Sequence, residues 1–589
     1  KVVPVGAAYV EGALPAGRTH SALARPAAPA AFLSTSIAMP LRLAGCSPRC
    51  GAHFAGRAAP HVRFAPLRSA AGRPGRLGRE APSVAASRRT ARRLQVAQVV
   101  EVAGSGSHEE GRTPAPPQRA PDNSPGSTTV VGGGPAGLAT AIMLAQMGYR
   151  CIKVLERLPA PPEPDSVEWG NPDRSYNLGI SARGQRALKL FGCWNRVDAR
   201  CAAVQGRLEI KADGTTTERL ATNKSVTTKI IQRDRLVACL LEELQQRYAE
   251  QVTVLHETEV QGVEWEDGGG AGRPPRVELH CRGPQGETAL VSEFLVGADG
   301  FNSSVPLAMQ AVPGSTFRRQ VYEDTNARVY KTVFYNPPAS FRRDMNYSIT
   351  SVATGDDALT LEALPTREGL LCGLLLFRPG NRLVAGVTSA ADAKALFAEQ
   401  FPQLEGHLDE AEFAKFAAKP VSRLPVFQHC GAELHRADST VLLGDAIHTV
   451  KPYFGLGVNS AFEDVEVLRA SLLAADHTPA AALPAYSAAR AASARDLVQM
   501  SRRFDTGGFL GFVLPLIVDT LFHRIAPALF APSTLRMLQR DGVTFEQIRR
   551  RKQLDRAIQV LCIGALLGAA VMAARWLAGT AVRMLAGGA

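Results

Sequence analysis

The chain has 589 residues, of which 46% are hydrophobic and 21% are charged, and this composition is enough to bury a large core in two folded units. Its formal net charge is +13, but residues 1–120 hold 17 Lys and Arg residues against 5 acidic ones, which leaves 50 basic and 49 acidic residues in the other 469. The later chain is therefore almost neutral, which excludes the basic groove of a nucleic-acid-binding protein. The ten cysteines include no CxxC pair, so neither a metal site nor a disulfide framework is expected.

The N-terminal region, residues 1–125, is predicted to be a disordered transit and linker segment. From Met39 to Val100 it contains twelve Arg, no Lys and one acidic residue among many Ala, Gly, Pro and Ser residues. Arg-rich, acid-poor N-terminal segments are typical of mitochondrial and chloroplast transit peptides. The high Ala, Pro and Gly content favours a chloroplast (plastid) address, and a mitochondrial address stays open as the alternative.

A first glycine fingerprint follows the linker, in STTVVGGGPAGLATAIMLAQMG. Gly132, Gly134 and Gly137 come after a β-branched strand and before an apolar helix. In that context they permit a tight turn, close approach of a pyrophosphate and close helix–strand packing. A second strand, CIKVLE, ends in Glu156, where an acid accepts hydrogen bonds from an adenosine ribose that carries no 2′-phosphate. The pattern predicts a site for FAD or NAD, and not for NADP.

The middle of the chain is predicted to be a nucleotide-binding domain interrupted by a sheet. Residues 260–281 predict a hairpin with a glycine-rich loop, and a second fingerprint, Asp299 and Gly300, follows in FLVGADGFNSSV. Between residues 306 and 438 the runs ARVYKTVFY, ALTLEAL and GLLCGLLLF predict strands of an antiparallel sheet. The chain then returns to the nucleotide-binding domain with TVLLGD.

A third fingerprint, Gly444 and Asp445 in TVLLGDAIHTVKPYFGLGVNSAFEDV, is expected to carry the chemistry. The segment is similar to the GD motif of flavin hydroxylases, and this resemblance implies that Asp445, at a strand end, holds the ribityl hydroxyls of FAD. Residues 452–457 would then pass close to the isoalloxazine ring. The helix from about Asn459 would aim its positive N-terminus at the flavin N1–O2 edge. His448 is interpreted as a structural turn residue.

The C-terminal region combines a helical cap with an apolar tail. Residues 557–574 have one polar side chain, Gln559, and as a helix would span roughly 27 Å, close to the hydrocarbon thickness of a bilayer. With basic residues on both sides, the stretch predicts a membrane anchor, and a buried core helix is the alternative. Residues 507–530, broken by two prolines and Asp519, are predicted to form a cap helix over the site that also touches lipid.

Taken in their order, the three fingerprints resemble the GxGxxG, DG and GD motifs of the single-component flavin hydroxylases of the 4-hydroxybenzoate hydroxylase type. RSYNLGISARGQRALKLFG (174–192), the Ile-x-Arg-x-x-Leu run at 231–236 and the hydrophobic tail are similar to the kynurenine 3-monooxygenase family. The resemblance covers residues 127–585. It implies an α/β fold in which a Rossmann-like FAD-binding domain is interrupted by an antiparallel-sheet substrate domain and followed by C-terminal helices and a membrane-anchor helix.

The implied domains are FAD-binding segments at 126–310 and 438–475, a substrate-domain sheet at 311–437, a helical cap at 476–556 and an anchor at 557–581. The implied cofactor is FAD, with NADPH or NADH as reductant, O2 as co-substrate and a small molecule as substrate. The reaction would be hydroxylation of an aromatic or electron-rich carboxylate through a flavin C4a-hydroperoxide, which needs a dry pocket. The implied cofactor-binding residues are Gly132, Gly134, Ala136, Gly137, Glu156, Arg157, Gly179, Arg183, Arg233, Asp299, Gly300, Gly444, Asp445, Gly457 and Asn459. The implied catalytic loop contains Pro452, Phe454, Gly455 and Leu456.

The substrate pocket is expected to differ from that of the kynurenine hydroxylases. Arg207 matches the arginine of that family that binds the substrate carboxylate, and a planar guanidinium suits such a group. The family's two substrate tyrosines fall on Ala221 and Phe545, and the Gln of its FGQG sequence becomes Leu456. With three polar groups lost, an unchanged ligand is not expected. Two alternatives stay open, a plastid flavin epoxidase or reductase of an isoprenoid lipid, and a membrane-tethered FAD-binding redox protein that no longer hydroxylates.

Overall fold

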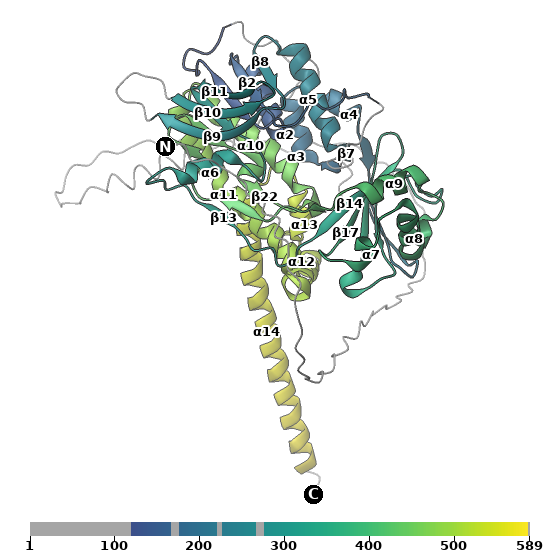
Figure 1. Ribbon diagram of the computed structural model, residues 1–589. Coiled ribbons are helices and arrows are strands. Elements are labelled where there is room, and N and C mark those ends of the chain that lie inside the picture. Colours follow the sequence, from purple (N-terminus) through teal and green to yellow (C-terminus); the bar gives the residue numbers. More distant parts are fainter. Residues whose placement is uncertain (1–118, 167–175, 221–226, 267–275, 587–589) are drawn as a thin grey trace, which may run out of the picture. The chain divides into compact units, whose positions relative to one another are not determined.

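The computed structural model describes residues 119–166, 176–220, 227–266 and 276–586, with side chains up to residue 583. Most of the predicted transit and linker segment, the glycine-rich hairpin loop and Ala221 lie outside the described residues. Figure 1 shows the arrangement of the described elements.

A six-stranded sheet, in the order β20-β21-β12-β1-β2-β8, forms the centre of the FAD-binding region. Its strands pair in parallel except β20 with β21. The parallel strands are short apolar runs without alternation because both faces of the sheet are covered. The strands are β1 (Thr128–Val131), β2 (Ile152–Leu155), β8 (Val252–Leu255), β12 (Phe294–Gly297), β20 (His435–Arg436) and β21 (Thr440–Leu442).

Helices from distant parts of the chain pack together in this region, and the apolar side of a β-meander joins the same core. The meander contains the predicted hairpin, as β9 and β10 pair in antiparallel fashion. The helices are α2 (Pro135–Gln146), α3 (Ala182–Leu190), α4 (Trp194–Asp198), α5 (Arg233–Arg247), α6 (Ser304–Ala311) and α10 (Leu456–Ala474). The meander is β9 (Glu259–Glu266), β10 (Arg276–Gly283) and β11 (Gly286–Ser292).

The second large sheet has the strand order β18-β14-β17-β16-β15-β5-β6. The three predicted strand runs form β14, β16 and β17, and every pair is antiparallel except β5 with β15. β5 and β6 come from the stretch assigned by sequence to the FAD-binding domain, so this sheet is not built from residues 311–437 alone. The strands are β5 (Gly206–Ile210), β6 (Thr216–Leu220), β14 (Val329–Tyr335), β15 (Met345–Thr350), β16 (Thr360–Pro365), β17 (Leu371–Phe377) and β18 (Ser422–Arg423).

Helices share an apolar core with one face of this sheet; the opposite face, called here the uncovered face, lies outside that core, although Cys372 and Leu374 on it are buried. Residues 345, 347 and 349 of β15 share a buried cluster with apolar residues of α8 and α9. The alternate residues of β15 therefore point to the uncovered face. The covering helices are α7 (Arg382–Ala385), α8 (Ala390–Gln400) and α9 (Glu410–Ala418). Two small sheets complete the described strands, namely β3 (Asn177–Ile180) with β7 (Thr228–Gln232) and β4 (Ala202–Val204), and β13 (Arg319–Val321) with β19 (Gln428–Cys430) and β22 (His448–Thr449).

The C-terminal region is helical, as predicted, but its breaks differ from those expected. The chain turns at Gly508, where φ is +53°. Pro515 lies in the first turn of α12, where a proline is tolerated, and Asp519 lies within that helix. The elements are α11 (Pro479–Thr506), the π-helical turn η5 (Phe509–Val513), α12 (Leu514–Ile525), α13 (Thr534–Leu538) and α14 (Phe545–Ala586).

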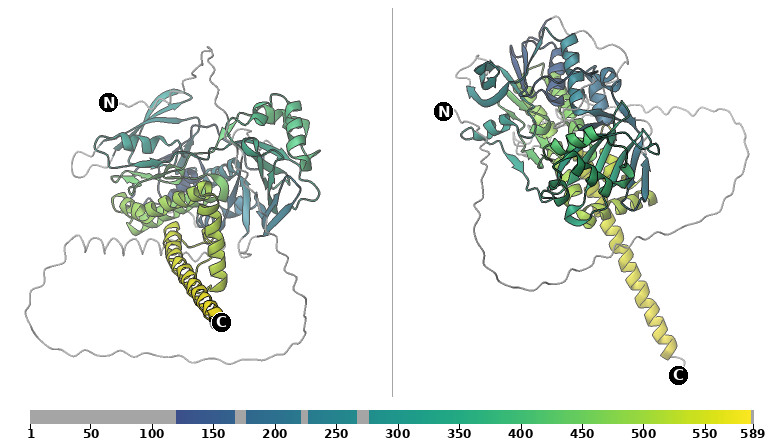
Figure 2. Two further views of the ribbon diagram at one scale, coloured as in Figure 1. Left: turned by 90° about the horizontal axis from the view of Figure 1, so that it is seen from below. Right: turned by 45° about the vertical axis from the view of Figure 1, so that its right-hand side comes forward.

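The predicted anchor lies within the long helix α14, which runs from the cap to the C-terminus (Figures 1 and 2). Residues 545–583 are long and apolar enough to cross a membrane, with a mean hydropathy of 2.2 in an 18-residue window of which 6% is buried. Within the described residues little protein surrounds the apolar side chains of this window, which favours the anchor over the alternative of a buried core helix.

Candidate cofactor site

Four parallel strands of the FAD-binding region end next to one another, and each is followed by a predicted site residue. Gly132 follows β1, Glu156 follows β2, Asp299 follows β12 and Asp445 follows β21. The carboxyl ends of parallel strands are where open α/β sheets bind their ligands. The three fingerprints, which are far apart in sequence, therefore lie at one edge of the sheet.

The first fingerprint forms a turn that accepts only glycine at two positions. Gly132 has φ +105°, and a Cβ there would lie 2.4 Å from the carbonyl oxygen of Ala298. A Cβ at Gly137 would lie 1.9 Å from the carbonyl oxygen of Gly132. At Gly134, by contrast, the one atom within 4 Å of such a Cβ is a guanidinium nitrogen of Arg233, at 3.8 Å. The N-terminus of α2 is thus open beside an arginine, an arrangement that fits a pyrophosphate.

Glu156 lies at the expected ribose position and also shapes the turn. Its Oε2 accepts a hydrogen bond from the Gly133 amide at 2.8 Å, and its Oε1 accepts one from the Leu158 amide at 2.9 Å. The neighbouring Arg157 is exposed. The assignment of Glu156 and Arg157 to the cofactor stays a prediction.

Asp299 of the second fingerprint caps helix α6. Its carboxylate accepts hydrogen bonds from the Ser303 hydroxyl and from the amide and hydroxyl of Ser304, the last two at 2.6 and 2.9 Å. Burial raises the pKa of Asp299, and these hydrogen bonds oppose that rise. Gly300 has φ +81° and open space where a Cβ would be. In the structure the Asp299 carboxylate bonds to protein, and Gly300 supplies the turn.

Asp445 of the third fingerprint faces the second sheet through a tyrosine. Burial raises the pKa of Asp445, while His448 and Arg233 act to lower it. Tyr176 lies near Arg233, Asp445 and Tyr330 of β14, and burial raises the pKa of its phenol to about 12. The chain at Tyr176 connects the FAD-binding region with the second sheet, because the Tyr176 carbonyl accepts a hydrogen bond from the Arg233 amide at 3.0 Å, and Asn177 donates to the carbonyls of Leu364 and Pro365 of β16 at 3.2 and 3.3 Å.

The buried Lys451 holds the start of residues 452–457, the segment expected to pass close to the isoalloxazine ring. Lys451 donates to Asp324 at 2.8 Å, to Asp505 at the end of α11 at 2.9 Å and to the Asn326 carbonyl at 2.7 Å. The 3₁₀ turn η4 (Pro452–Phe454) follows.

Gly455 then adopts the left-handed conformation, with φ +61°, at the N-cap of α10. The helix begins at Leu456, three residues before the predicted Asn459. Asn459 bonds the Ser181 amide and the carbonyls of Gly179 and Gly455 at 2.6 to 3.0 Å. Asn459 and Gly179 thus fix the N-terminus of α10 against β3.

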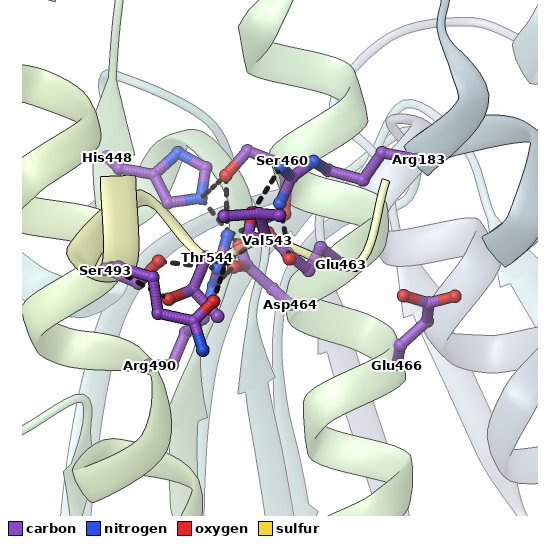
Figure 3. A network of polar contacts seen from close by, with 12 residues as sticks. Arg183, His448, Ser460, Glu463, Asp464, Glu466, Arg490, Ser493, Val543 and Thr544 are labelled. Atoms are coloured by element: carbon purple, nitrogen blue, oxygen red, sulfur yellow. Dashed lines mark hydrogen bonds and ion pairs between the residues drawn. The ribbon is translucent and has the colours of Figure 1, made fainter. Parts of the chain in front are cut away.

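A buried network behind this turn, shown in Figure 3, holds the third fingerprint in place. Asp464 of α10 accepts hydrogen bonds at 2.8 Å from the Gly444 amide and from His448 Nε2, and one from Arg490 of α11. Burial alone would raise the pKa of Asp464, but Arg490 and His448 lower it. His448 is fully buried and also lies 3.3 Å from the Ser460 hydroxyl. This geometry agrees with its interpretation as a structural residue.

The other half of the network ties the C-terminal segment to α3 and α10. Arg183 pairs with Glu463 and donates to the Val543 carbonyl at 2.9 Å, and its guanidinium lies 4.6 Å from the centre of the Phe545 ring. Burial alone would raise the pKa of Glu463, but Arg183 and Arg490 lower it to about 2. Arg183 was predicted to bind the cofactor and Phe545 to line the substrate pocket. In the structure both contact the C-terminal segment, where the arginine stacks on the ring, and their assignment to the cofactor and to the substrate pocket stays a prediction.

The predicted substrate arginine lies on the uncovered face of the second sheet. Arg207 of β5 pairs with Glu362 of β16 at 2.8 Å and lies 3.7 Å from Glu209. The Ser348 hydroxyl donates to the same oxygen of Glu362 at 2.8 Å. The Arg207 side chain is 39% exposed, so it is accessible but already neutralised by an acid. Ala221 lies outside the described residues.

Sequence reasoning missed the buried charges that hold the site. The signal for two of them was present, because Glu463 and Asp464 interrupt the apolar part of a helix and buried acids require cationic partners. Nothing in the sequence pointed to Arg490, Lys451 or Tyr176 as members of the site.

The comparisons with known proteins agree with this geometry. A family model described as an FAD binding domain matches residues 127–501. The kynurenine 3-monooxygenase of Salinispora arenicola (strain CNS-205) is 28% identical over 456 residues, which are 75% of this chain and 94% of that protein. The kynurenine 3-monooxygenase of Stenotrophomonas maltophilia (strain K279a) is 30% identical over 390 residues, 64% of this chain and 78% of that protein.

Among solved structures, the tetrameric form of 2-methyl-3-hydroxypyridine-5-carboxylic acid oxygenase has a TM-score of 0.50 and 17% identity, covering 67% of this chain and 93% of that chain. This likeness supports the fold alone. The predicted fold class, the FAD cofactor and the assignment as an FAD-dependent monooxygenase are confirmed. The chain belongs to the FAD-binding-domain family and is a kynurenine 3-monooxygenase-like member of the single-component FAD-dependent aromatic hydroxylases.

Proposed function

We propose that this FAD-dependent aromatic hydroxylase uses NADPH or NADH and O2 to hydroxylate an aromatic or electron-rich carboxylate other than kynurenine. The observation that carries the proposal is that Tyr176 and Asn177 join Arg233 of the FAD-binding region to β16 of the second sheet. It supports a site bounded on one side by the third fingerprint and on the other by the uncovered sheet face, where Arg207 lies.

When bound, FAD supplies hydride acceptance from the nicotinamide and activation of O2. The residues of the chain bind and orient it. The open N-terminus of α2 and Arg233 would hold the pyrophosphate, and the Asp445 carboxylate would accept hydrogen bonds from the ribityl hydroxyls. The free amides that follow Gly455 at the start of α10 would stabilise negative charge at the flavin N1–O2 edge. The apolar residues Phe454 and Leu456 would help to keep water from the reacting atoms.

On the substrate side, Arg207 would bind a carboxylate, but it must first leave Glu362. That exchange makes the substrate compete with a protein carboxylate for the same guanidinium. The relatives are named for kynurenine hydroxylation. Leu456 offers no side-chain hydrogen bond where that family has a Gln. A site built to hydrogen-bond a ligand discriminates strongly against a poor match, which supports a substrate with fewer polar groups than kynurenine.

The test is NADPH and NADH consumption by the full-length FAD-loaded protein over a panel of aromatic carboxylates, with peroxide measured in parallel. Coupled consumption without peroxide identifies a substrate, and consumption that ends in peroxide identifies only an effector. Arg207→Lys keeps the charge but loses the two-point fork, so the KM of a coupled carboxylate should rise roughly tenfold to a hundredfold with FAD content unchanged.

Arg219→Lys is the matched control, because Arg219 is the cross-strand neighbour of Arg207 on β6 and is mostly exposed. Its KM should stay at the wild-type value. If Arg207→Lys left the KM of every coupled carboxylate unchanged, the carboxylate clamp would be wrong.

We also propose that α14 anchors the enzyme in a plastid membrane, with a mitochondrial membrane as the alternative. The exposed apolar window of α14 supports the membrane part, and the Arg-rich composition of residues 39–100 supports the address. A fluorescent protein fused after residues 39–125 should enter plastids, and the full-length enzyme should stay with membranes in high salt. Import into mitochondria would select the alternative. Release of the enzyme by salt would contradict the anchor.

A lipid-derived substrate is the second candidate, an isoprenoid acted on by a flavin epoxidase or reductase. The exposed apolar helix supports it, because a membrane-anchored enzyme meets lipid-soluble compounds at high local concentration. Coupled turnover of an isoprenoid in vesicles, together with no turnover of any carboxylate, would favour this candidate.

A further inference from the structure

The segment between α11 and α13 exposes a row of large apolar side chains. Leu510, Leu514, Ile517, Leu521 and Ile525 recur at spacings of three and four residues, so they lie on one side of η5 and α12. Leu510 and Ile525 are 75% and 72% exposed. A continuous apolar face of this kind on a protein in water marks an interaction site. We call these five residues the α12 face.

The opposite side of α12 carries one buried charge, Asp519, among the partly buried apolar residues Leu516 and Phe522. Asp519 is 1% exposed and faces α14. It pairs with Arg556 at 3.1 Å and with Lys552 at 3.3 Å, and it accepts a hydrogen bond from Gln559 at 3.3 Å. The charged groups lie between α12 and α14, and the apolar side chains of α12 point outward. This arrangement fits apolar surroundings and not water.

The α12 face is adjacent to the part of α14 proposed to cross the membrane. The contacts of Asp519 place α12 beside residues 552–559, directly before the exposed apolar residues Val560, Leu561 and Leu566. Basic residues at 549–551 lie at the start of this region, where they would meet anionic lipid headgroups. The continuity with α14 and the flanking positive charge identify the occupant of the face as a lipid bilayer.

The same segment is joined to residues 452–457, which we call the flavin loop. Phe512 of η5 packs on Phe504 of α11 with ring centres 5.2 Å apart, and Phe504 packs edge-on against Phe454 of η4 at 5.1 Å. Asp505, next to Phe504, holds Lys451 at the base of the flavin loop. Two aromatic contacts, Phe512–Phe504 and Phe504–Phe454, therefore join the segment that exposes the apolar face to residues expected to border the isoalloxazine ring.

From these contacts we propose that the α12 face is embedded in the bilayer that α14 crosses, so that the flavin loop is held at the membrane surface. The proposal rests on the proposed crossing of the membrane by α14. It adds a second attachment, at the membrane interface. This attachment brings the flavin loop next to lipid, which a single membrane-spanning helix alone would not do.

The test is photolabelling of the full-length FAD-loaded protein in vesicles of phosphatidylcholine and phosphatidylglycerol that contain a phospholipid with a diazirine in its acyl chain. Adducts are located by mass spectrometry of peptides. We expect adducts in residues 509–525 and in 557–583, and none at Val352 or Leu220, which are exposed apolar residues far from α12 in sequence. Adducts on α14 without adducts on 509–525 would overturn the proposal and leave the anchor standing. Absence of both would overturn both.

A charge on the face gives a second, independent measurement. Leu521→Glu should lower the adducts on 509–525 about fivefold or more, because a carboxylate is costly to place in lipid, while adducts on α14 stay unchanged. Val352→Glu is the matched control and should change neither. An unchanged adduct yield in Leu521→Glu with normal FAD content would overturn the proposal, and the wild-type labelling decides the question if that variant does not fold.

Discussion

Replacing Asp464 with Asn should destabilise the enzyme and loosen FAD together. Asp464 is fully buried and accepts three hydrogen bonds, from the Gly444 amide, His448 and Arg490. The change keeps the size of the side chain but removes its charge. Arg490 then keeps one acidic partner, Glu463, at 2.8 Å. The Gly444 amide, which shapes the turn before Asp445, must share a single amide oxygen with the other two donors.

The magnitude follows from the burial of all the partners. Breaking a buried ion pair by removing one member costs about 3 to 5 kcal/mol. We expect a value near the lower end, about 3 kcal/mol, because Glu463 still neutralises Arg490 and one hydrogen bond can survive on the new amide. With an unfolding entropy of about 2 cal/mol/K per residue, a folded region of this size loses roughly 3 °C of unfolding temperature for that free energy. The looser Gly444 turn should weaken FAD binding about tenfold.

The assay is thermal unfolding followed by flavin fluorescence in detergent, with the FAD dissociation constant measured by titration of the apoprotein. Asp496→Asn is the matched control. Asp496 is also fully buried, but its partners Arg495 and Arg549 are partly exposed and it does not touch the Gly444 turn. It should lower the unfolding temperature less and leave the FAD affinity unchanged. An Asp464→Asn enzyme within about 0.5 kcal/mol of the wild type in both measurements would refute the reasoning.

Three further outcomes are expected. Asp445→Ala removes the proposed hydrogen bonds to the ribityl hydroxyls, so it should weaken FAD binding by about 2 kcal/mol, roughly thirtyfold. The measurement is a fluorescence titration with Asp438→Ala as the control, and an unchanged affinity in Asp445→Ala would remove Asp445 from the site. Because the pKa of Glu463 is lowered from 4.5 to about 2, its stabilising contribution is complete above pH 4.5 and is lost as the pH falls toward 2, so the stability of the wild type should fall more steeply over that range than that of Glu463→Gln. Ala221→Tyr should raise kynurenine-dependent NAD(P)H oxidation if the pocket otherwise keeps the shape of the kynurenine hydroxylases, and no increase would show that more than this hydroxyl is missing.

The elements that sequence predicted well are those whose cause is local. The first fingerprint could be placed because the steric demand at Gly132 and Gly137 arises within a few residues. The strands β14, β16 and β17 could be placed because each is a short apolar or alternating run. The assignment of β5 and β6 to the second sheet could not be made from the sequence. β5 pairs in parallel with β15 across more than a hundred intervening residues, and the sequence of a strand does not indicate which distant strand it pairs with.

The same distinction applies to the site residues. A motif predicts where a residue lies, but not which atom its side chain bonds. Asp299 lies at the expected strand end, yet its carboxylate caps α6. Arg183 lies near the flavin helix, yet it faces Glu463 and the Val543 carbonyl. Both outcomes depend on segments that fold against the motif from elsewhere in the chain, and the C-terminal segment 540–545 is the clearest example.

The pairing of Arg207 with Glu362 narrows the choice of substrate further. A guanidinium without a partner would attract any carboxylate. For Arg207 the gain in free energy is only the difference between its interaction with the substrate and its interaction with Glu362, which also accepts a hydrogen bond from Ser348. A small, well-hydrated carboxylate has little to offer in that exchange, because its desolvation offsets most of the new ion pair. A substrate with a large apolar body adds binding free energy in proportion to the area it buries. The segment that carries the α12 face is joined to the flavin loop by two aromatic contacts, through Phe512 and Phe504, and its apolar surroundings would enrich such a substrate. If Arg207 binds the substrate carboxylate as proposed, its pairing with Glu362 and the proposed membrane face would both favour an aromatic carboxylate with a substantial hydrophobic part.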